Sequence, residues 1–285
     1  MDGLPVKGTI GCGGLMMKVV IICIFAVLVL YLYLIAPRMC KKPDRKAFLG
    51  VHYAHRGLFD NEGDAPENSL AAFKKAVDAG YGIELDVQLS KDKVPVVFHD
   101  AGLYRMCGVD GNVWQYTLEE LQQMKLKKSN QTIPTFADAL AVIDGKVPVI
   151  IEYKMDVPDT LVCELGDQLL KDYKGVYCME SFDPSAVRWY KKHRPQVLRG
   201  QLSMDFSKEE WSKGKLRYWL LSHLLTNVQC RPDFIAYDWH SAHMLSRRVC
   251  GKLGALSAAW TVRSQEDYEK AKDDFDIFIF DSFRL

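Results

Sequence analysis

The sequence predicts an α/β protein, a TIM (β/α)8 barrel preceded by one transmembrane helix. Strand-like and helix-like segments alternate from Val51 to the C-terminus, which is typical of α/β architecture. The part of the chain that follows the apolar N-terminal run is close in length to such barrels, which typically have about 250 residues. Two small domains fit that length less well. An uninterrupted apolar run from Val19 to Ala36 predicts the membrane helix.

The N-terminal segment is divided by its composition. We expect a tail over residues 1–14, a transmembrane helix over 15–36 and a basic linker over 37–48. Pro37 would end the helix. A cleaved signal peptide is the alternative, but its apolar core is usually only about 7–15 residues long. Leu34-Ile35-Ala36 is also a poor cleavage site, so we expect an uncleaved single-pass anchor in the cell membrane.

The basic residues around the apolar run predict its orientation. Lys7 and Lys18 precede it, whereas a larger group follows it: Arg38, Lys41, Lys42, Arg45 and Lys46. The positive-inside bias therefore places the domain in the cytoplasm, although the same group could instead sit on anionic headgroups. A domain that faces outward remains the alternative. Five cysteines scattered through the domain without a C-x-x-C pair suit reduced thiols and exclude zinc-type spacing.

The elements of the domain follow from local patterns. A first strand over 51–56 leads to a helix over 68–79, which has one apolar face and ends at Gly80. Strands over 83–89 and 94–99 are joined by a four-residue turn. A capping box at Thr117 and Glu120 opens a short helix after an irregular stretch. Asp183 and Pro184 are typical of a helix N-terminus. The remaining strands are expected over 147–154, 176–181, 198–203, 234–239, 256–262 and 276–281, and the remaining helices over 135–143, 160–173, 184–193, 207–227, 242–253 and 265–272.

This pattern contains nine strands, one more than the barrel needs. Strands 83–89 and 94–99 are too close in sequence for both to be parallel members with a crossover helix between them. We therefore expect one of the two to lie outside the parallel barrel. The formal net charge is +1, and the excess of basic residues before position 47 leaves the domain mildly acidic. A mildly acidic domain argues against nucleic-acid binding.

Three carboxylates are candidate metal ligands. Glu84 and Asp86 are two residues apart on a strand, so their side chains share one face. Glu152 lies at the end of another strand. Oxygen ligands without a thiolate favour one divalent cation, Mg²⁺ or Ca²⁺, over zinc. The alternative is that Glu84 pairs with a lysine and Asp86 is solvated.

Two histidines and two cations complete the candidate chemistry. His55 and His99 end their strands and could serve as general base and general acid, because imidazole titrates near neutral pH. Arg56 offers a planar fork to a phosphate, and Lys154 a point charge. In a TIM barrel the chemistry is at the carboxyl ends of the strands, where these four residues are expected.

Two other groups of residues have a structural interpretation. His240 and His243 could be a ligand pair, but without a third ligand the structural role is favoured. The aromatic segment from Trp211 to Leu225 could touch a membrane, because lysines and an arginine flank it. An outer barrel helix that packs on the sheet is the favoured interpretation of this segment.

The order of the motifs resembles one known family. His55-Arg56-Gly57, Pro66-Glu67-Asn68-Ser69, Glu84-Leu85-Asp86 and His99-Asp100 look like the N-terminal signature of glycerophosphodiester phosphodiesterases. Further similarities extend the resemblance over about residues 50–285: Leu103 with Arg105, Ile133-Pro134-Thr135, Ile151-Glu152-Tyr153-Lys154, Ser181-Phe182-Asp183 and Ala259-Trp260-Thr261-Val262. The anchor resembles that of membrane-tethered bacterial members.

The resemblance implies a fold and a set of roles. The family has a TIM barrel, here over residues 49–285, with a small insertion at about 100–131. By similarity, Glu84, Asp86 and Glu152 would bind one divalent metal, and His55 and His99 would be the acid–base pair. Arg56 and Lys154 would contact the phosphate, and Trp260 would line the pocket. The implied reaction is metal-dependent hydrolysis of a glycerophosphodiester to sn-glycerol 3-phosphate and an alcohol.

Some positions depart from the family pattern. Lys93 stands in a turn where the family usually has glycine, Met106-Cys107 replaces polar residues, and Phe280-Asp281 replaces a common Thr-Asp. The last two departures leave the leaving alcohol open. One alternative is therefore a lysophospholipase D-like or phosphatidylglycerol-directed enzyme that takes lysophospholipid-type substrates. A membrane-tethered binding barrel without catalysis is a third hypothesis, and the sequence does not predict an oligomeric state.

Overall fold

The structure is a computed structural model that describes residues 12–155 and 159–285. Residues 1–11 of the expected tail lie outside this part of the chain. In the described residues nine strands form one sheet, in the order β1-β9-β8-β7-β6-β5-β4-β2-β3. The strands are β1 His52–His55, β2 Gly82–Leu89, β3 Pro95–Val97, β4 Val149–Tyr153, β5 Tyr177–Ser181, β6 Arg199–Ser203, β7 Phe234–Asp238, β8 Leu256–Val262 and β9 Ile277–Phe280.

Eight of these strands close into a parallel barrel. β1 pairs in parallel with both β9 and β2, which joins the two ends of the row. β3 pairs only with β2 and runs antiparallel to it, so it is the surplus strand expected from the short turn. Lys93 in that turn has a φ of 65°. This left-handed conformation favours glycine, which is the residue that the family usually has at this position. The TIM-barrel prediction is confirmed.

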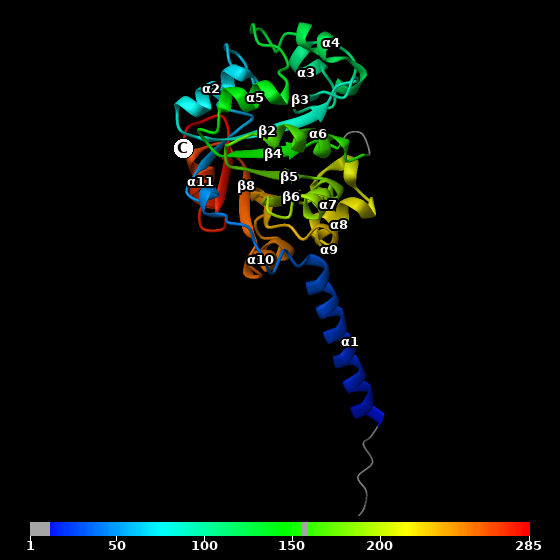
Figure 1. Cartoon of the computed structure of the whole chain (residues 1–285). Coiled ribbons are helices and arrows are strands. Elements are labelled where there is room, and N and C mark those ends of the chain that lie inside the picture. Colours follow the sequence, from blue (N-terminus) through cyan, green and yellow to red (C-terminus); the bar gives the residue numbers. More distant parts are fainter. Residues whose placement is uncertain (1–11, 156–158) are drawn as a thin grey trace, which may run out of the picture.

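Helices surround the barrel (Figure 1). The caps predicted from the sequence are present: Thr117 forms a capping box with Glu120, and the Asp183 side chain accepts from the backbone N–H of Ser185. The helices of the domain are α2 Leu70–Asp78, α3 Tyr104–Cys107, α4 Leu118–Gln123, α5 Phe136–Ile143, α6 Leu161–Leu170, α7 Pro184–His193, α8 Leu216–Ser222, α9 Asn227–Cys230, α10 Leu245–Lys252 and α11 Gln265–Ala271.

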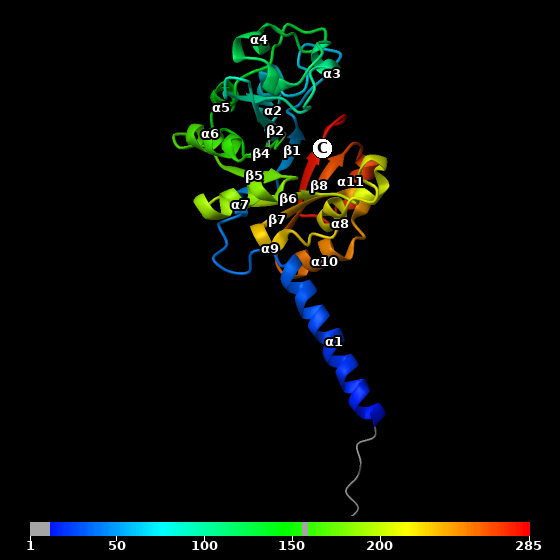
Figure 2. The same ribbon diagram turned by 90° about the vertical axis from the view of Figure 1, so that its right-hand side faces the viewer.

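An insertion lies between β3 and α5. It contains α3, α4 and the 3-10 helix η2 Val113–Gln115, and it encloses a small apolar core that includes Leu103, Met106 and Leu121. Met106, one of the departures from the family pattern, is therefore a buried packing residue. In both views the insertion lies at the end of the molecule opposite the N-terminal helix (Figures 1 and 2).

The N-terminal helix α1 spans Cys12–Ile35 and projects from the domain. In the described residues it is the one helix that is long and apolar enough to cross a membrane, over Gly14–Ile35, and its most apolar 18-residue window is not buried in the protein. These properties fit both a membrane span and a signal sequence. The chain then passes through the 3-10 helix η1 Lys46–Phe48 into β1.

The prediction of one element, a long helix, is wrong. The long helix over 207–227 is replaced by the 3-10 helices η3 Phe206–Lys208 and η4 Glu210–Ser212, followed by α8 and α9. Gly214 has a φ of 71°, which breaks the helical path before α8. The first of these 3-10 helices is capped by Asp205, whose side chain accepts from the N–H of Ser207. Sequence periodicity suggested one helix because apolar residues recur through the break.

Candidate active site

Parallel register brings the predicted site residues to one level of the barrel. His55 on β1 lies opposite Glu84 on β2, and Asp86 lies opposite Glu152 on β4. Glu152 in turn lies opposite Glu180 on β5. Because Glu84 and Asp86 alternate with apolar residues along β2, both point to the same face of that strand. The sequence therefore assembles an acidic layer from three neighbouring strands.

The three predicted metal ligands meet inside this layer. Each of Glu84, Asp86 and Glu152 offers a carboxylate oxygen, and these oxygens lie within 4.8 Å of one another. All three side chains are buried, as is the neighbouring Glu180, one of whose oxygens has no hydrogen-bond partner. Buried carboxylates are costly unless a cation compensates them. This donor set therefore fits one hard divalent cation.

The carboxylates of the layer shift one another's pKa values. Burial, together with the neighbouring charges of Asp86 and Glu152, raises the pKa of Glu84 well above its ordinary value. Burial also raises the pKa of Glu152, although Lys154 opposes that shift. For Asp86 burial acts upward, but Lys154, His99 and Arg56 outweigh it and hold the pKa well below the ordinary value. A bound cation would relieve the repulsion felt by Glu84.

His55 is held in a defined orientation at the mouth of the barrel. Its Nδ1 lies 3.0 Å from Oδ2 of Asp281, and its Nε2 lies 3.9 Å from Oε2 of Glu84. Burial lowers the pKa of His55 to about 4, and the hydrogen bond to Asp281 partly opposes this shift. The imidazole is therefore neutral at neutral pH and is able to accept a proton.

His99 has a similar carboxylate partner. Its Nδ1 lies 2.7 Å from Oδ1 of Asp100, and Oδ2 of the same carboxylate accepts from Nε of Arg105 at 2.5 Å. His99 is close enough to the acidic layer to help lower the pKa of Asp86 and to oppose the rise in that of Glu152. The two histidines thus face one acidic layer, each with a carboxylate at its Nδ1.

The predicted cations contact the same layer. Lys154 Nζ lies 2.8 Å from Asp86 Oδ1 and 2.7 Å from Glu152 Oε2. The backbone N–H of Arg56 donates to Glu84 Oε2 at 3.0 Å, and its Nε lies 3.7 Å from Asp86 Oδ2. The alternative in which Asp86 is solvated is therefore wrong. The pKa of Lys154 is raised because the two carboxylates outweigh the effect of burial.

Trp260 lies on β8, where the register places it opposite Asp238 at the end of β7. Its indole N–H is buried and has no hydrogen-bond partner. Its ring packs edge to face on Phe182, with centroids 5.5 Å apart. A buried donor without a partner is unusual, and this one is available to a ligand.

Several contacts were not expected from the sequence. Asn68 donates to Asp86 Oδ2 at 2.7 Å, and Glu67 receives Arg56 Nη1 at 2.6 Å and Arg105 Nη2 at 2.6 Å. Glu67 and Asn68 belong to a motif recognised in the sequence, yet their roles follow only from the folded loop. His240 and His243 lie outside the acidic layer, which is the one cluster of three potential metal ligands in the described residues.

Known proteins share both the sequence pattern and the fold. The Glycerophosphoryl diester phosphodiesterase family matches residues 55–282. A glycerophosphodiester phosphodiesterase of Caldanaerobacter subterraneus is 30% identical over 234 residues, which are 76% of this chain and 87% of that protein. The lysophospholipase D of Rattus norvegicus is 29% identical over 157 residues, 50% of this chain and 48% of that protein.

Solved structures agree. A phosphodiesterase of Oleispira antarctica in complex with the product sn-glycerol-3-phosphate aligns with a TM-score of 0.67 at 25% identity, covering 82% of this chain and 94% of that one. The glycerophosphodiester phosphodiesterase of Thermotoga maritima aligns with a TM-score of 0.61 at 26% identity, covering 81% of this chain and 94% of that one. With the family pattern extending from His55 almost to the end of the barrel, the chain belongs to the Glycerophosphoryl diester phosphodiesterase family.

Proposed function

We propose that this barrel hydrolyses glycerophosphodiesters to sn-glycerol 3-phosphate and an alcohol, with one divalent cation held by Glu84, Asp86 and Glu152. Membership of the family makes the chain a phosphoric diester hydrolase, and the buried acidic triad supports the proposed cation. The observation that carries the assignment of residues is the buried acidic layer between two carboxylate-bound histidines. The oxygen ligands favour Mg²⁺ or Ca²⁺.

The residues of the chain suggest a division of roles. When bound, the cation would neutralise phosphate charge and act as a Lewis acid. Arg56, whose guanidinium is fixed by Glu67, is placed to hold a phosphate oxygen, and Lys154 adds a second positive charge. Trp260 offers its free indole N–H and an apolar wall to the glycerol.

The two histidines are proposed to move the protons. His55 is neutral at neutral pH, so it suits the general base that deprotonates the attacking hydroxyl. That hydroxyl belongs either to water or to the neighbouring glycerol carbon, the second by way of a cyclic phosphate. His99, whose Nδ1 faces Asp100, is the candidate acid that protonates the leaving alkoxide. Asp281 and Asp100 hold the two rings in position.

We also propose a membrane location for the enzyme. Residues 15–36 would form a single-pass anchor, 37–48 a basic linker and 49–285 the catalytic domain on the cytoplasmic side. The length and apolar composition of α1 support the anchor, and the basic residues after it support the orientation.

A second candidate is a lysophospholipase D-like activity on acylated substrates. It is favoured by similarity to the rat lysophospholipase D over about half of that protein. A membrane anchor would also place the barrel beside lipid substrates. Turnover of a lysophospholipid at a rate comparable to that of its deacylated counterpart would support this activity, and strict preference for deacylated diesters would exclude it.

The proposal is tested with the purified full chain and a panel of glycerophosphodiesters, with and without chelator. Release of glycerol 3-phosphate should need added Mg²⁺ or Ca²⁺. His55→Ala and Glu84→Ala should each lose at least about a hundredfold in rate, as expected for acid–base and metal roles. His193→Ala and Glu119→Gln, which alter exposed residues outside the site, are the matched controls. No product from any diester under any metal condition would favour the non-catalytic binding barrel.

A further inference from the structure

The end of α1 is fixed on the barrel without a flexible spacer. Ile35 is fully buried and belongs to the main apolar core. Its carbonyl accepts from Asn227 Nδ2 at 2.9 Å, and Arg231 Nη1 donates to the carbonyls of Tyr33 and Ala36 at 2.7 and 2.9 Å. The Arg231 guanidinium also lies 4.7 Å from the centre of the Tyr33 ring. The direction of α1 therefore sets which side of the barrel faces a membrane.

That side is formed by α8, α9 and α10. In both views α1 leaves the domain beside α9 and α10, with α8 next to them (Figures 1 and 2). In Figure 1 strands β4 and β5 run across the direction of α1. With α1 in a bilayer, the barrel would rest on the membrane on its α8–α10 side.

Apolar residues on this side are unusually exposed. Leu216 and Trp219 on α8 are 68% and 53% exposed, and Leu245 at the start of α10 is 66% exposed. Exposed Lys213 and Lys215 flank them, and Lys215 has no acidic partner among the described residues. We refer to these five residues as the α8 surface. The favoured interpretation of this segment, a helix that packs on the sheet, does not account for the exposed residues.

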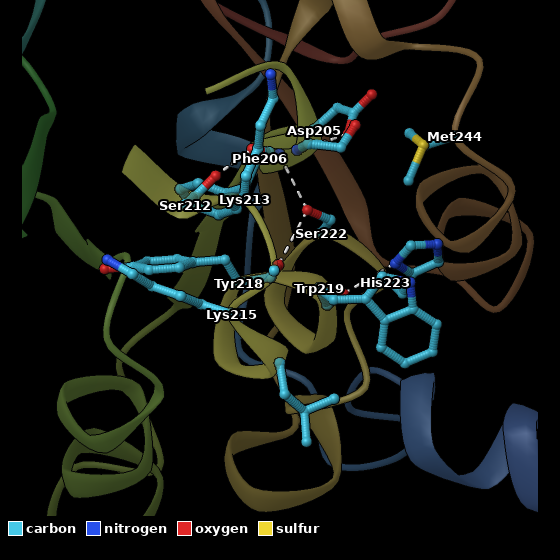
Figure 3. A pocket seen from close by; sticks show the side chains of 13 residues that line it. Asp205, Phe206, Ser212, Lys213, Lys215, Tyr218, Trp219, Ser222, His223 and Met244 are labelled. Carbon is cyan, nitrogen blue, oxygen red and sulfur yellow. Dashed lines mark hydrogen bonds between the residues drawn. The ribbon is translucent and has the colours of Figure 1, made fainter. Parts of the chain in front are cut away.

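A cavity of about 610 Å³ lies behind the α8 surface. Its lining combines the apolar side chains of Phe206, Tyr218, Trp219 and Met244 with Lys213 and Lys215. Figure 3 shows Trp219 and His223 next to each other on one side of the cavity, and their ring centroids are 4.5 Å apart. Aromatic rings beside lysines are the side chains that membrane–water interfaces and anionic headgroups favour.

We propose that the α8 surface is a second membrane contact, which rests on the anionic phospholipid leaflet where α1 ends. The inference depends on the proposed role of α1 as an anchor, but not on the proposed reaction. Two independent features support it: the fixed junction directs this side toward the bilayer, and the surface combines exposed Trp219 and Leu216 with unpaired Lys215.

The α8 surface is also connected to the active site. Phe206, which lines the cavity, packs against Phe182 with ring centroids 6.1 Å apart, and Phe182 packs against Trp260 at 5.5 Å. A row of aromatic contacts therefore links the lining of this cavity to Trp260.

The experiment measures tryptophan fluorescence of the full chain in nanodiscs. The discs contain phosphatidylcholine with about a quarter phosphatidylglycerol, which supplies the negative surface, and the acyl chains are either brominated near the glycerol or unbrominated. Bromine quenches only nearby indoles. Trp219→Phe should lose at least half of the wild-type quenching. Trp114→Phe, the matched control in the insertion at the opposite end of the molecule, should keep it.

A second variant tests the electrostatic part of the contact. Replacing phosphatidylglycerol with phosphatidylcholine should weaken the quenching in the wild type, and Lys215→Glu should remove this lipid dependence. Equal quenching in Trp219→Phe, Trp114→Phe and the wild type would overturn the contact. Because the readout needs no turnover, an inactive enzyme with the expected quenching would refute only the proposed reaction. An active enzyme without it would refute only the α8 contact.

Discussion

At the scale of single residues, Asp281 shows how the site depends on a residue to which the sequence analysis gave no role. Its Oδ2 faces His55 Nδ1, and its Oδ1 receives Arg263 Nε at 3.2 Å and the Ser282 hydroxyl at 2.7 Å. The carboxylate is thus fixed from two sides and in turn fixes the imidazole. A carboxylate in this position also favours the tautomer that leaves Nε2 free to accept a proton.

Asp281→Asn should therefore change both the rate and its pH dependence. Asp281 raises the pKa of His55 against the effect of burial, so its loss should lower that pKa further. The acid limb of the kcat/KM profile should move to lower pH, and kcat should fall by about tenfold or more because the base is weaker and less well oriented. The control is Asp78→Asn, which alters an exposed residue of α2. An unchanged acid limb in Asp281→Asn would show that His55 is not the base.

Glu67 joins the site to the insertion through charge. It is buried and pairs with both Arg56 and Arg105. Burial acts to raise its pKa, but hydrogen bonds from Arg105 and Asn61 and the charge of Arg56 lower it from 4.5 to about 2. Because the folded pKa is below the unfolded one, the resulting stability is complete above about pH 4.5 and is lost as the pH falls toward 2.

Glu67→Gln should remove this pH-dependent contribution to the free energy of unfolding. We expect the variant to be less stable than the wild type by about 2 kcal/mol at neutral pH, and the difference to shrink as the pH falls below the unfolded pKa. Urea unfolding across this pH range measures it. Glu62→Gln, an exposed neighbour, should follow the wild type. A difference that stays constant with pH would mean that the charge of Glu67 is not what stabilises the fold.

At the scale of elements, the connection from β1 to α2 has the tightest backbone requirement near the site. Arg56 and Gly57 both have positive φ, 55° and 81°. A Cβ on Gly57 would lie 2.9 Å from the backbone carbon and Cβ of Ala72 on α2. The turn that presents the Arg56 N–H to Glu84 therefore needs a residue without a side chain.

Two glycine substitutions separate the clash from the backbone strain. Gly57→Ala should lower the free energy of unfolding by more than about 2 kcal/mol, because it adds a clash to the cost of positive φ. Gly80→Ala, at a φ of 75° with open space around it, should cost only about 1 kcal/mol. Chemical unfolding of both variants gives the comparison. Similar losses would mean that α2 adjusts to the added methyl group.

Sequence patterns predicted the strands better than the contacts between them. The alternation of strand-like and helix-like segments, together with turn residues, was enough to predict all nine strands. The short link between β2 and β3 correctly predicted that one strand lies outside the parallel barrel. The prediction of one helix over 207–227 was wrong because hydrophobic periodicity does not detect a glycine in the left-handed conformation, such as Gly214. Among site residues, Glu180 was missed because nothing in its own segment shows that register places it opposite Glu152.

At the scale of the whole molecule, the acidic layer concentrates buried negative charge at the centre of the barrel. Without a cation the buried carboxylates raise the cost of ionising one another, as the raised pKa of Glu84 shows. Such a layer destabilises the metal-free fold and stabilises the metal-bound one. The metal is therefore expected to contribute to the stability of the entire domain.

Thermal unfolding with and without metal should show how the acidic layer and its cation affect stability. In chelator, Glu84→Gln should melt at or above the wild-type temperature because one buried charge is removed. Mg²⁺ or Ca²⁺ at a hundredfold excess over Kd should raise the wild-type free energy of unfolding by about 3 kcal/mol, and with it the Tm. The same addition should have little effect on the variant. Glu119→Gln on exposed α4 should respond as the wild type does. A metal-induced shift of equal size in Glu84→Gln would place the ion elsewhere.

The central claim is that one divalent cation in the acidic layer is needed for hydrolysis of the diester. It is tested most directly by measuring bound metal and glycerol 3-phosphate release in the same samples of wild type, Asp86→Asn and Glu152→Gln. We predict about one ion per wild-type chain, product formation in proportion to that occupancy, and loss of both in each variant. Full activity in chelator, or undiminished metal binding in both variants, would contradict the account.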